Sequence, residues 1–177
     1  MVSPPIDYLS LGLEYYLLAM SVVIFIVNLH RLRGYEVSEF FLNPFRSSSP
    51  GEFWARWNIP VHEWLRADVF LKAGGRHHFW RATLLTFIVS GIFHEYTISL
   101  ASNTLNGFML TYFLIQFLAF QMGASLHHLL SKSTLYRKME TGKSLLVIRW
   151  TLTMVSVFLP SVLFLHNLRN VFPIHGM

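Results

Sequence analysis

Four long apolar runs alternate with polar, basic segments along this chain of 177 residues. A membrane-spanning helix needs about 20 mostly apolar residues. Residues 9–29, 82–102, 108–130 and 147–168 meet that length, and Pro160 predicts a kink in the last run. The pattern therefore predicts an all-α, polytopic membrane protein with about four transmembrane helices, in which residues 1–177 form a single membrane domain.

The segment 43–80 has a different pattern. It opens on a Pro/Ser/Gly turn region and continues with apolar residues at helical spacing, at Phe53, Trp57, Val61, Trp64/Leu65 and Val69. Charged side chains lie off that stripe. We therefore expect an amphipathic helix in the cytosolic interface plane, bent near Pro60, with tryptophans 54, 57 and 64 at the headgroup level.

Composition and charge support a membrane protein and argue against a nucleic-acid partner. Only 13% of residues are charged, whereas soluble domains carry about 25%. Thirteen of the 14 Lys and Arg residues fall in two loops, 30–81 and 131–149. With four spans both loops lie on one side, which the positive-inside rule makes cytosolic. We therefore interpret the net charge of +5 as a signal that orients the protein in a membrane. Both termini are then expected on the side opposite the cytosol.

Several kinds of site and signal are not expected. The chain has no cysteine, which excludes disulfides, thiolate metal ligands and a cysteine nucleophile. No Lys or Arg precedes the first apolar run, which argues against a cleaved signal peptide. His94 and Glu95 are not followed by a second histidine at the spacing of an HExxH zinc motif. We therefore predict no metal site.

The His94–Glu95 pair lies inside the second apolar run and is the first candidate for chemistry. An acidic side chain at the centre of a bilayer costs roughly 2.5 to 3.5 kcal/mol, so it needs a partner or a function. Ser90 and Gly91 share the helix face of His94, which places the imidazole toward a protein interior or cavity. A neutral imidazole there can take a proton from an alcohol. The alternative is a structural histidine bonded across a helix interface.

Two motifs together resemble a known family. FWARWNIPVHEWLR (Phe53–Arg66), followed by SGIFHEY (Ser90–Tyr96), resembles the membrane-bound O-acyltransferase family. The similarity covers about Asn43 to Leu100 and points to the branch of plant-type wax synthases and diacylglycerol and sterol acyltransferases. NPFRSSSPGEFWARWN is most similar to wax synthases, whereas WNIPVHEW is more similar to the diacylglycerol and sterol enzymes. The remainder of the chain fits the family in hydropathy only.

The resemblance implies an acyl-CoA-dependent transfer of a fatty acyl group to a lipid hydroxyl. The family's essential histidine falls on His94 and its second signature position on Asn58, which would help to place substrate. Ser90 would support them, and Glu95 would position either the histidine or a neighbouring helix. The CoA phosphates would meet basic residues, with Arg56, Arg66, Lys72 and Arg76 as candidates.

The resulting expectation is a wax ester synthase-like enzyme that uses acyl-CoA as co-substrate and needs no other cofactor. The alternatives are a diacylglycerol or sterol acyltransferase, a truncated relative that binds lipid or a partner without catalysis, and a small transporter with a proton relay at His94–Glu95. Expected partners are acyl-CoA, a lipid alcohol, membrane lipids, and a second copy or another membrane subunit. The protein would lie in the endoplasmic reticulum if eukaryotic, or in the inner membrane if bacterial.

Overall fold

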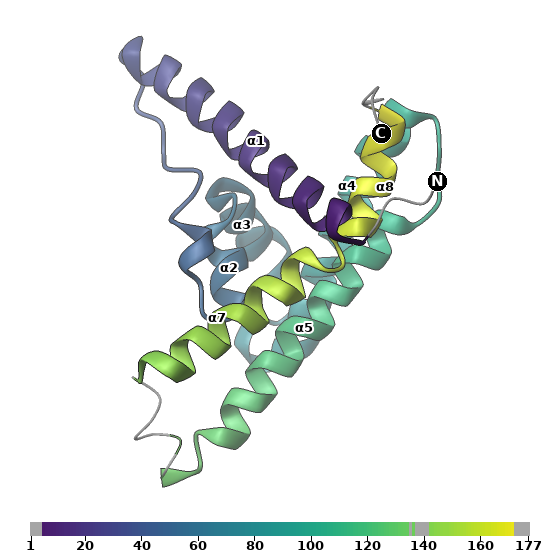
Figure 1. Cartoon of the computed structure of the whole chain (residues 1–177). Coiled ribbons are helices and arrows are strands. Elements are labelled where there is room, and N and C mark those ends of the chain that lie inside the picture. The colour runs from purple at the N-terminus through teal and green to yellow at the C-terminus, as the bar shows by residue number, and fades with distance from the viewer. Residues whose placement is uncertain (1–4, 135, 137–141, 172–177) are drawn as a thin grey trace.

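The computed structural model describes residues 5–134, 136 and 142–171, and no strand occurs among them. Figure 1 shows the arrangement of its helices, which confirms the all-α prediction. The longer helices are α1 (Pro5–Leu32), α4 (Phe79–Ser102), α5 (Phe108–Leu130), α7 (Lys143–Phe158) and α8 (Ser161–Val171). Short helices connect α1 to α4, namely η1 (Pro44–Arg46), α2 (Pro50–Arg56), α3 (Ile59–Leu65), the π-helix η2 (Arg66–Phe70) and η3 (Gly75–His78).

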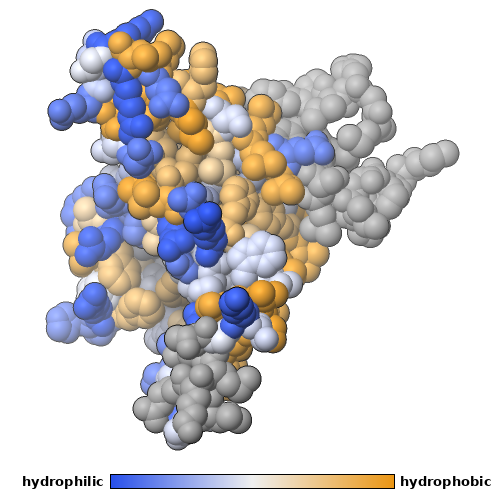
Figure 2. Space-filling view, turned by 60° about the vertical axis from the view of Figure 1, so that its left-hand side comes forward, coloured by the Kyte–Doolittle hydropathy of each residue, from blue (hydrophilic) through white to orange (hydrophobic). Residues whose placement is uncertain are grey.

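The apolar helices occur where hydropathy predicts them. Three helical segments are long and apolar enough to cross a membrane, Gly75–Ser102, Phe108–Leu130 and Lys143–His166, and Tyr16–Leu32 of α1 is a shorter apolar helix. Figure 1 shows α1 diverging from the other long helices, with α2 and α3 beside it. On the face shown in Figure 2, hydrophilic residues gather along the left-hand edge and hydrophobic residues cover much of the middle.

The last predicted span is divided at Pro160. α7 ends at Phe158 and α8 begins at Ser161, because proline has no N–H to donate and its ring clashes with the preceding turn. The Ser161 hydroxyl donates to the Phe158 carbonyl over 2.6 Å, which satisfies one of the acceptors at the end of α7. The apolar segment Lys143–His166 is therefore interrupted at Pro160, where the sequence predicts a kink.

The single amphipathic helix predicted within residues 43–80 is wrong. The chain forms two short helices, α2 and α3, separated at Asn58, whose φ of 49° is left-handed. Pro60 does not bend a continuous helix. It lies in the first turn of α3, where a proline costs nothing because that N–H has no helical partner. The stripe residue Phe53 is fully buried, so this segment packs into the protein.

The long helices α4 and α5 pack closely where α4 carries a glycine. A Cβ added at Gly91 would lie 3.1 Å from the Cα of Leu110, so a larger residue would push the two helices apart by a few tenths of an ångström. Further along the same contact, Phe87 of α4 packs with three α5 residues in a buried cluster of Phe87, Tyr112, Phe113 and Phe117. The α4–α5 pair therefore forms the core against which α2 and α8 pack.

Candidate active site

A cavity of about 940 Å³ lies between α1, α2, α3, α4, α5 and α8. It is at the upper end of the size range of small-molecule sites, about 300 to 1,000 Å³. Most of its lining is apolar, including Leu18, Val22, Val61, Leu65, Phe70, Phe79, Phe87, Phe120 and Leu165. Asn58 and His94, which the two sequence motifs single out, both line it. The fold therefore brings the two predicted catalytic residues to one chamber.

The local geometry of His94 defines which ring nitrogen is free. Its Nδ1 lies 2.8 Å from the carbonyl oxygen of Ser90, one turn earlier in α4. A carbonyl oxygen can only accept, so Nδ1 carries the proton and Nε2 has a lone pair. The ring packs on Phe113 and Phe164, with centroid distances of 4.7 and 6.0 Å. The half-buried imidazole faces a cavity, as predicted, with a basic nitrogen available.

Glu95 binds the backbone at the start of the neighbouring helix, α5. Its carboxylate is 7% exposed and accepts hydrogen bonds from the backbone N–H groups of Gly107 and Met109, both over 2.9 Å. Longer bonds come from Asn106 and Leu110, at 3.3 and 3.4 Å. These groups are the otherwise unpaired donors at the start of α5, where the helix dipole also favours a negative charge. Of the two roles expected for Glu95, its contacts fit that of positioning a helix.

The amide oxygen of Asn58 has no hydrogen-bond partner in the part of the chain that the structure describes. Asn58 occupies the N-cap position of α3, but its side chain makes no capping bond. Its Oδ1 is buried and has no hydrogen-bond partner among the described residues. Buried polar atoms are nearly always paired, so an unpaired amide oxygen on a cavity residue is ready for a ligand. The side chain does not cap α3, whereas the left-handed backbone of Asn58 does interrupt the helix between α2 and α3.

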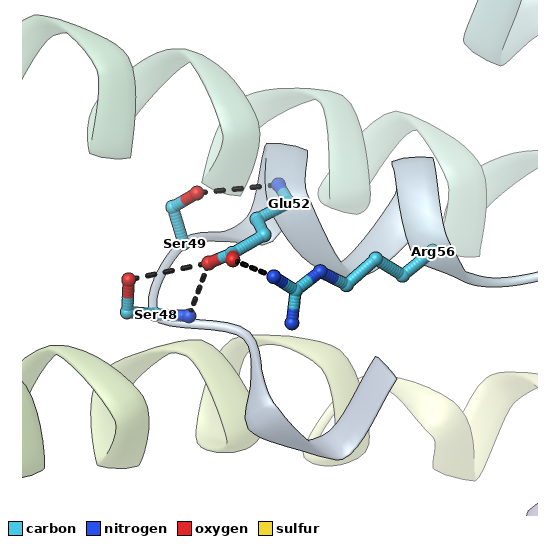
Figure 3. Close-up of polar contacts among 4 residues, drawn as sticks. All are labelled: Ser48, Ser49, Glu52 and Arg56. Carbon is cyan, nitrogen blue, oxygen red and sulfur yellow. Dashed lines mark hydrogen bonds and ion pairs between the residues drawn. The ribbon is translucent and has the colours of Figure 1, made fainter. Parts of the chain in front are cut away.

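Arg56 is held by an internal network at the start of α2 (Figure 3). Its guanidinium pairs with Glu52 over 2.6 Å. Glu52 also accepts from the backbone N–H of Ser48 at 2.7 Å, and the Ser49 hydroxyl accepts from the Glu52 N–H at 3.2 Å. This is a capping arrangement that fixes the helix start. The Arg56 charge therefore already has a partner.

The other basic candidates for CoA binding differ in position. Arg66 lines the cavity, whereas Lys72 pairs with Asp68 on the exposed surface. Arg76 is exposed and is not among the described residues that line the cavity. Of these three residues, Arg66 is the one that lines the cavity. CoA binding by any of the basic candidates stays a prediction.

Several cavity residues were not found from the sequence. Tyr16 and Tyr112 join their hydroxyls over 2.7 Å across α1 and α5, and both line the cavity. Their 96-residue separation leaves no sequence signal. Trp54 and Trp57, which were interpreted as headgroup anchors, also line the cavity, whereas Trp64 is 45% exposed. Trp54 and Trp57 thus contact the cavity, and placement of the three tryptophans at the headgroup level stays a prediction.

His62 also lines the cavity, from α3. Burial lowers the pKa of its imidazole, and the nearby positive charge of Arg66 lowers this pKa further. His62 is consequently neutral at pH 7. Among the described residues, no group of three or more His, Asp or Glu side chains could hold a metal ion.

Comparison with known proteins identifies the chain's relatives. Residues 11–147, well over half of the chain, match the membrane-bound O-acyltransferase family, MBOAT. Diacylglycerol O-acyltransferase 1 of Homo sapiens is 38% identical over 64 residues, which is 34% of this chain and 13% of that protein. A probable alginate O-acetylase of Pseudomonas putida is 32% identical over 72 residues, 38% of this chain and 15% of the relative.

These local matches span less than a sixth of either relative's length. The family match covers three of the four apolar helices completely or in large part. Together with the three helices that are long enough to cross a bilayer, it makes the chain an integral membrane protein. The polypeptide belongs to the membrane-bound O-acyltransferase family.

Proposed function

We propose that this protein transfers a fatty acyl group from acyl-CoA to a lipid hydroxyl, with His94 as general base. The observation that carries the proposal is the pairing of a free imidazole Nε2 with an unpaired Asn58 amide oxygen in one large, mostly apolar cavity. Membership of the family supports the same chemistry.

The proton has a complete path in this arrangement. The acceptor hydroxyl gives its proton to His94 Nε2 while its oxygen attacks the thioester carbonyl carbon. The tetrahedral intermediate then collapses with cleavage of the carbon–sulfur bond, and the departing CoA thiolate takes the proton from Nε2. The products are an ester and free CoA, and His94 returns to its starting state. The bond from Nδ1 to the Ser90 carbonyl keeps the ring oriented throughout.

The cavity lining favours long-chain substrates. Its walls carry Leu, Val and Phe side chains from four or more helices, which stabilise a buried alkyl chain by about 0.8 kcal/mol per CH₂ group. An acetyl group or a sugar polymer, the substrate class named for the alginate O-acetylase relative, would leave this surface unused. We therefore infer a fatty acyl donor and a lipid acceptor.

Within the lipid acceptors, we propose a long-chain alcohol, which would make the product a wax ester. This assignment rests on the NPFRSSSPGEFWARWN pattern. The similarity to diacylglycerol O-acyltransferase 1 supports diacylglycerol equally well as an acceptor. Acyl-CoA would approach with its phosphates toward Arg66, the one basic candidate that both lines the cavity and has no ion pair among those found in the described residues.

The test is acyl transfer by the purified protein in lipid nanodiscs, with labelled palmitoyl-CoA and a panel of fatty alcohol, diacylglycerol and sterol. We expect product from wild type and none above background from His94→Ala. His30→Ala is the matched control, because His30 makes the same ring-to-carbonyl bond, at 2.8 Å, on an exposed helix end. Full transfer by His94→Ala would contradict the proposal. Binding of palmitoyl-CoA without turnover by folded wild type would favour a lipid-binding relative.

A further inference from the structure

The Tyr16–Tyr112 pair is a polar feature of the cavity that the proposed mechanism does not use. The two hydroxyl oxygens are 2.7 Å apart, and the side chains come from α1 and α5. Tyr112 is 1% exposed, and both residues line the cavity. A pair of hydroxyls in such apolar surroundings needs an explanation beyond packing.

A count of protons shows that one donor is unused. Each phenol has one O–H proton, and the bond between them consumes only one of the two. No other hydrogen bond to a described residue is found for either hydroxyl. A buried donor without an acceptor costs about 1 to 3 kcal/mol. The second O–H group of the pair would therefore be satisfied by an acceptor oxygen on a bound ligand.

The neighbouring hydroxyls of the cavity differ in this respect. Three of them already donate their only proton to a backbone carbonyl one turn or less away, namely those of Thr83, Thr86 and Ser161. They leave no proton for a ligand. These three hydroxyls therefore differ from the tyrosine pair, which keeps one proton without an acceptor among the described residues.

The pair lies beside the proposed base. Phe113 packs on both His94 and Tyr112, with ring centroids 4.7 and 5.2 Å away. Phe164 does the same, at 6.0 and 5.7 Å. His94 and Tyr112 thus flank the same two rings. A thioester carbon placed near His94 would bring its carbonyl oxygen into the same part of the cavity as the tyrosine hydroxyls.

We propose that the Tyr16–Tyr112 pair donates a hydrogen bond to the carbonyl oxygen of the acyl donor. Negative charge develops on that oxygen as the alcohol attacks, and a fixed donor in a dry site stabilises it. This inference rests on the proposed function. The competing explanation is that the bond only ties α1 to α5, in which case the pair would not distinguish ligands with a carbonyl from ligands without one.

The experiment measures that distinction by binding. Two analogues of palmitoyl-CoA are compared in nanodiscs, a ketone in which a methylene replaces the thioester sulfur, and S-hexadecyl-CoA, which has no carbonyl. We expect wild type to favour the ketone by about 3- to 10-fold, the value of one hydrogen bond. The double variant Tyr16→Phe/Tyr112→Phe should lose this preference and bind S-hexadecyl-CoA as wild type does. Tyr96→Phe is the control, since Tyr96 is 63% exposed on α4.

Turnover gives a second readout. Loss of one oxyanion donor lowers kcat by about 10²- to 10³-fold, and we expect such a fall in the double variant, well beyond the loss of about 3- to 10-fold in carbonyl binding. If the double variant does not fold, the single variants decide the question, because one of them removes the hydroxyl that faces the carbonyl, and that variant must lose the ketone preference. A preference that survives in all folded variants, together with normal wild-type turnover, overturns this inference alone. Failure of wild type to bind either analogue overturns the proposed function as well.

Discussion

Replacement of Glu95 by glutamine should destabilise the protein, although the two side chains have the same shape. The carboxylate accepts from backbone N–H groups with both oxygens, from Gly107 on Oε1 and from Met109 on Oε2. A glutamine keeps one oxygen and places an NH₂ group where the other was. On whichever side that NH₂ lies, a donor faces a donor. If the side is that of Met109, which is fully buried, its N–H is left with no acceptor.

The expected cost of Glu95→Gln follows from two terms. A buried donor without an acceptor costs about 1 to 3 kcal/mol, and loss of a negative charge at a helix N-terminus costs about 0.3 to 1 kcal/mol. We expect the free energy of unfolding to fall by about 1 to 4 kcal/mol, the sum of the two terms. Unfolding in mixed micelles of increasing denaturing detergent, followed by circular dichroism, measures this change. Thr97→Val, on an exposed position of the same helix, is the control.

The same variant separates a structural from a chemical role for Glu95. Because the carboxylate is not among the described residues that line the cavity, the folded fraction of Glu95→Gln should keep acyl transfer within a few-fold of wild type. A Glu95→Gln protein that is as stable as wild type but has lost turnover would refute this reasoning. It would show that the carboxylate takes part in proton transfer with His94.

Three further perturbations test the site and its frame. Asn58→Gly removes the amide, and glycine readily adopts the left-handed backbone at φ 49°. Stability, measured by thermal unfolding, should therefore hold. Acyl transfer in the nanodisc assay should fall by about tenfold, the value of one hydrogen bond. Gly91→Ala places a Cβ 3.1 Å from the Leu110 Cα and should cost about 1 to 3 kcal/mol, seen as a lower unfolding midpoint. The pKa of His62 is lowered by burial and by Arg66, so the unfolded chain binds its proton more readily. Stability should therefore decrease as pH falls below about 6.5, and His62→Gln should flatten that part of the pH profile of unfolding.

Much of the fold and part of the site follow from the sequence. The apolar helices could be located because a span of lipid-exposed backbone must satisfy its hydrogen bonds within one helix, which ties hydropathy directly to structure. His94 could be predicted because an ionisable pair is unusual in an apolar run, and Asn58 because the resemblance to the family places its second signature position there. The side of the membrane that the basic loops face is a prediction from charge alone.

The interfacial segment shows where local pattern fails. Phe53 and Trp57 recur at helical spacing, but Phe53 is fully buried and Trp57 lines the cavity, and the chain turns at Asn58 between them and Val61. Hydropathy reports that a residue avoids water. It does not report whether lipid or protein replaces the water, because both are apolar surroundings.

Only the tertiary structure decided which side chains contact one another. Glu95 and His94 are adjacent in sequence, yet one caps α5 and the other faces the cavity, because successive residues of a helix point in different directions. The Tyr16–Tyr112 bond joins residues 96 positions apart, and no local pattern encodes such a contact. The sequence thus determined where the long apolar helices lie and marked His94 and Asn58 as candidates for chemistry. The packing of those helices determined which residues share a cavity, since close approach depends on the shapes of side chains from distant parts of the chain.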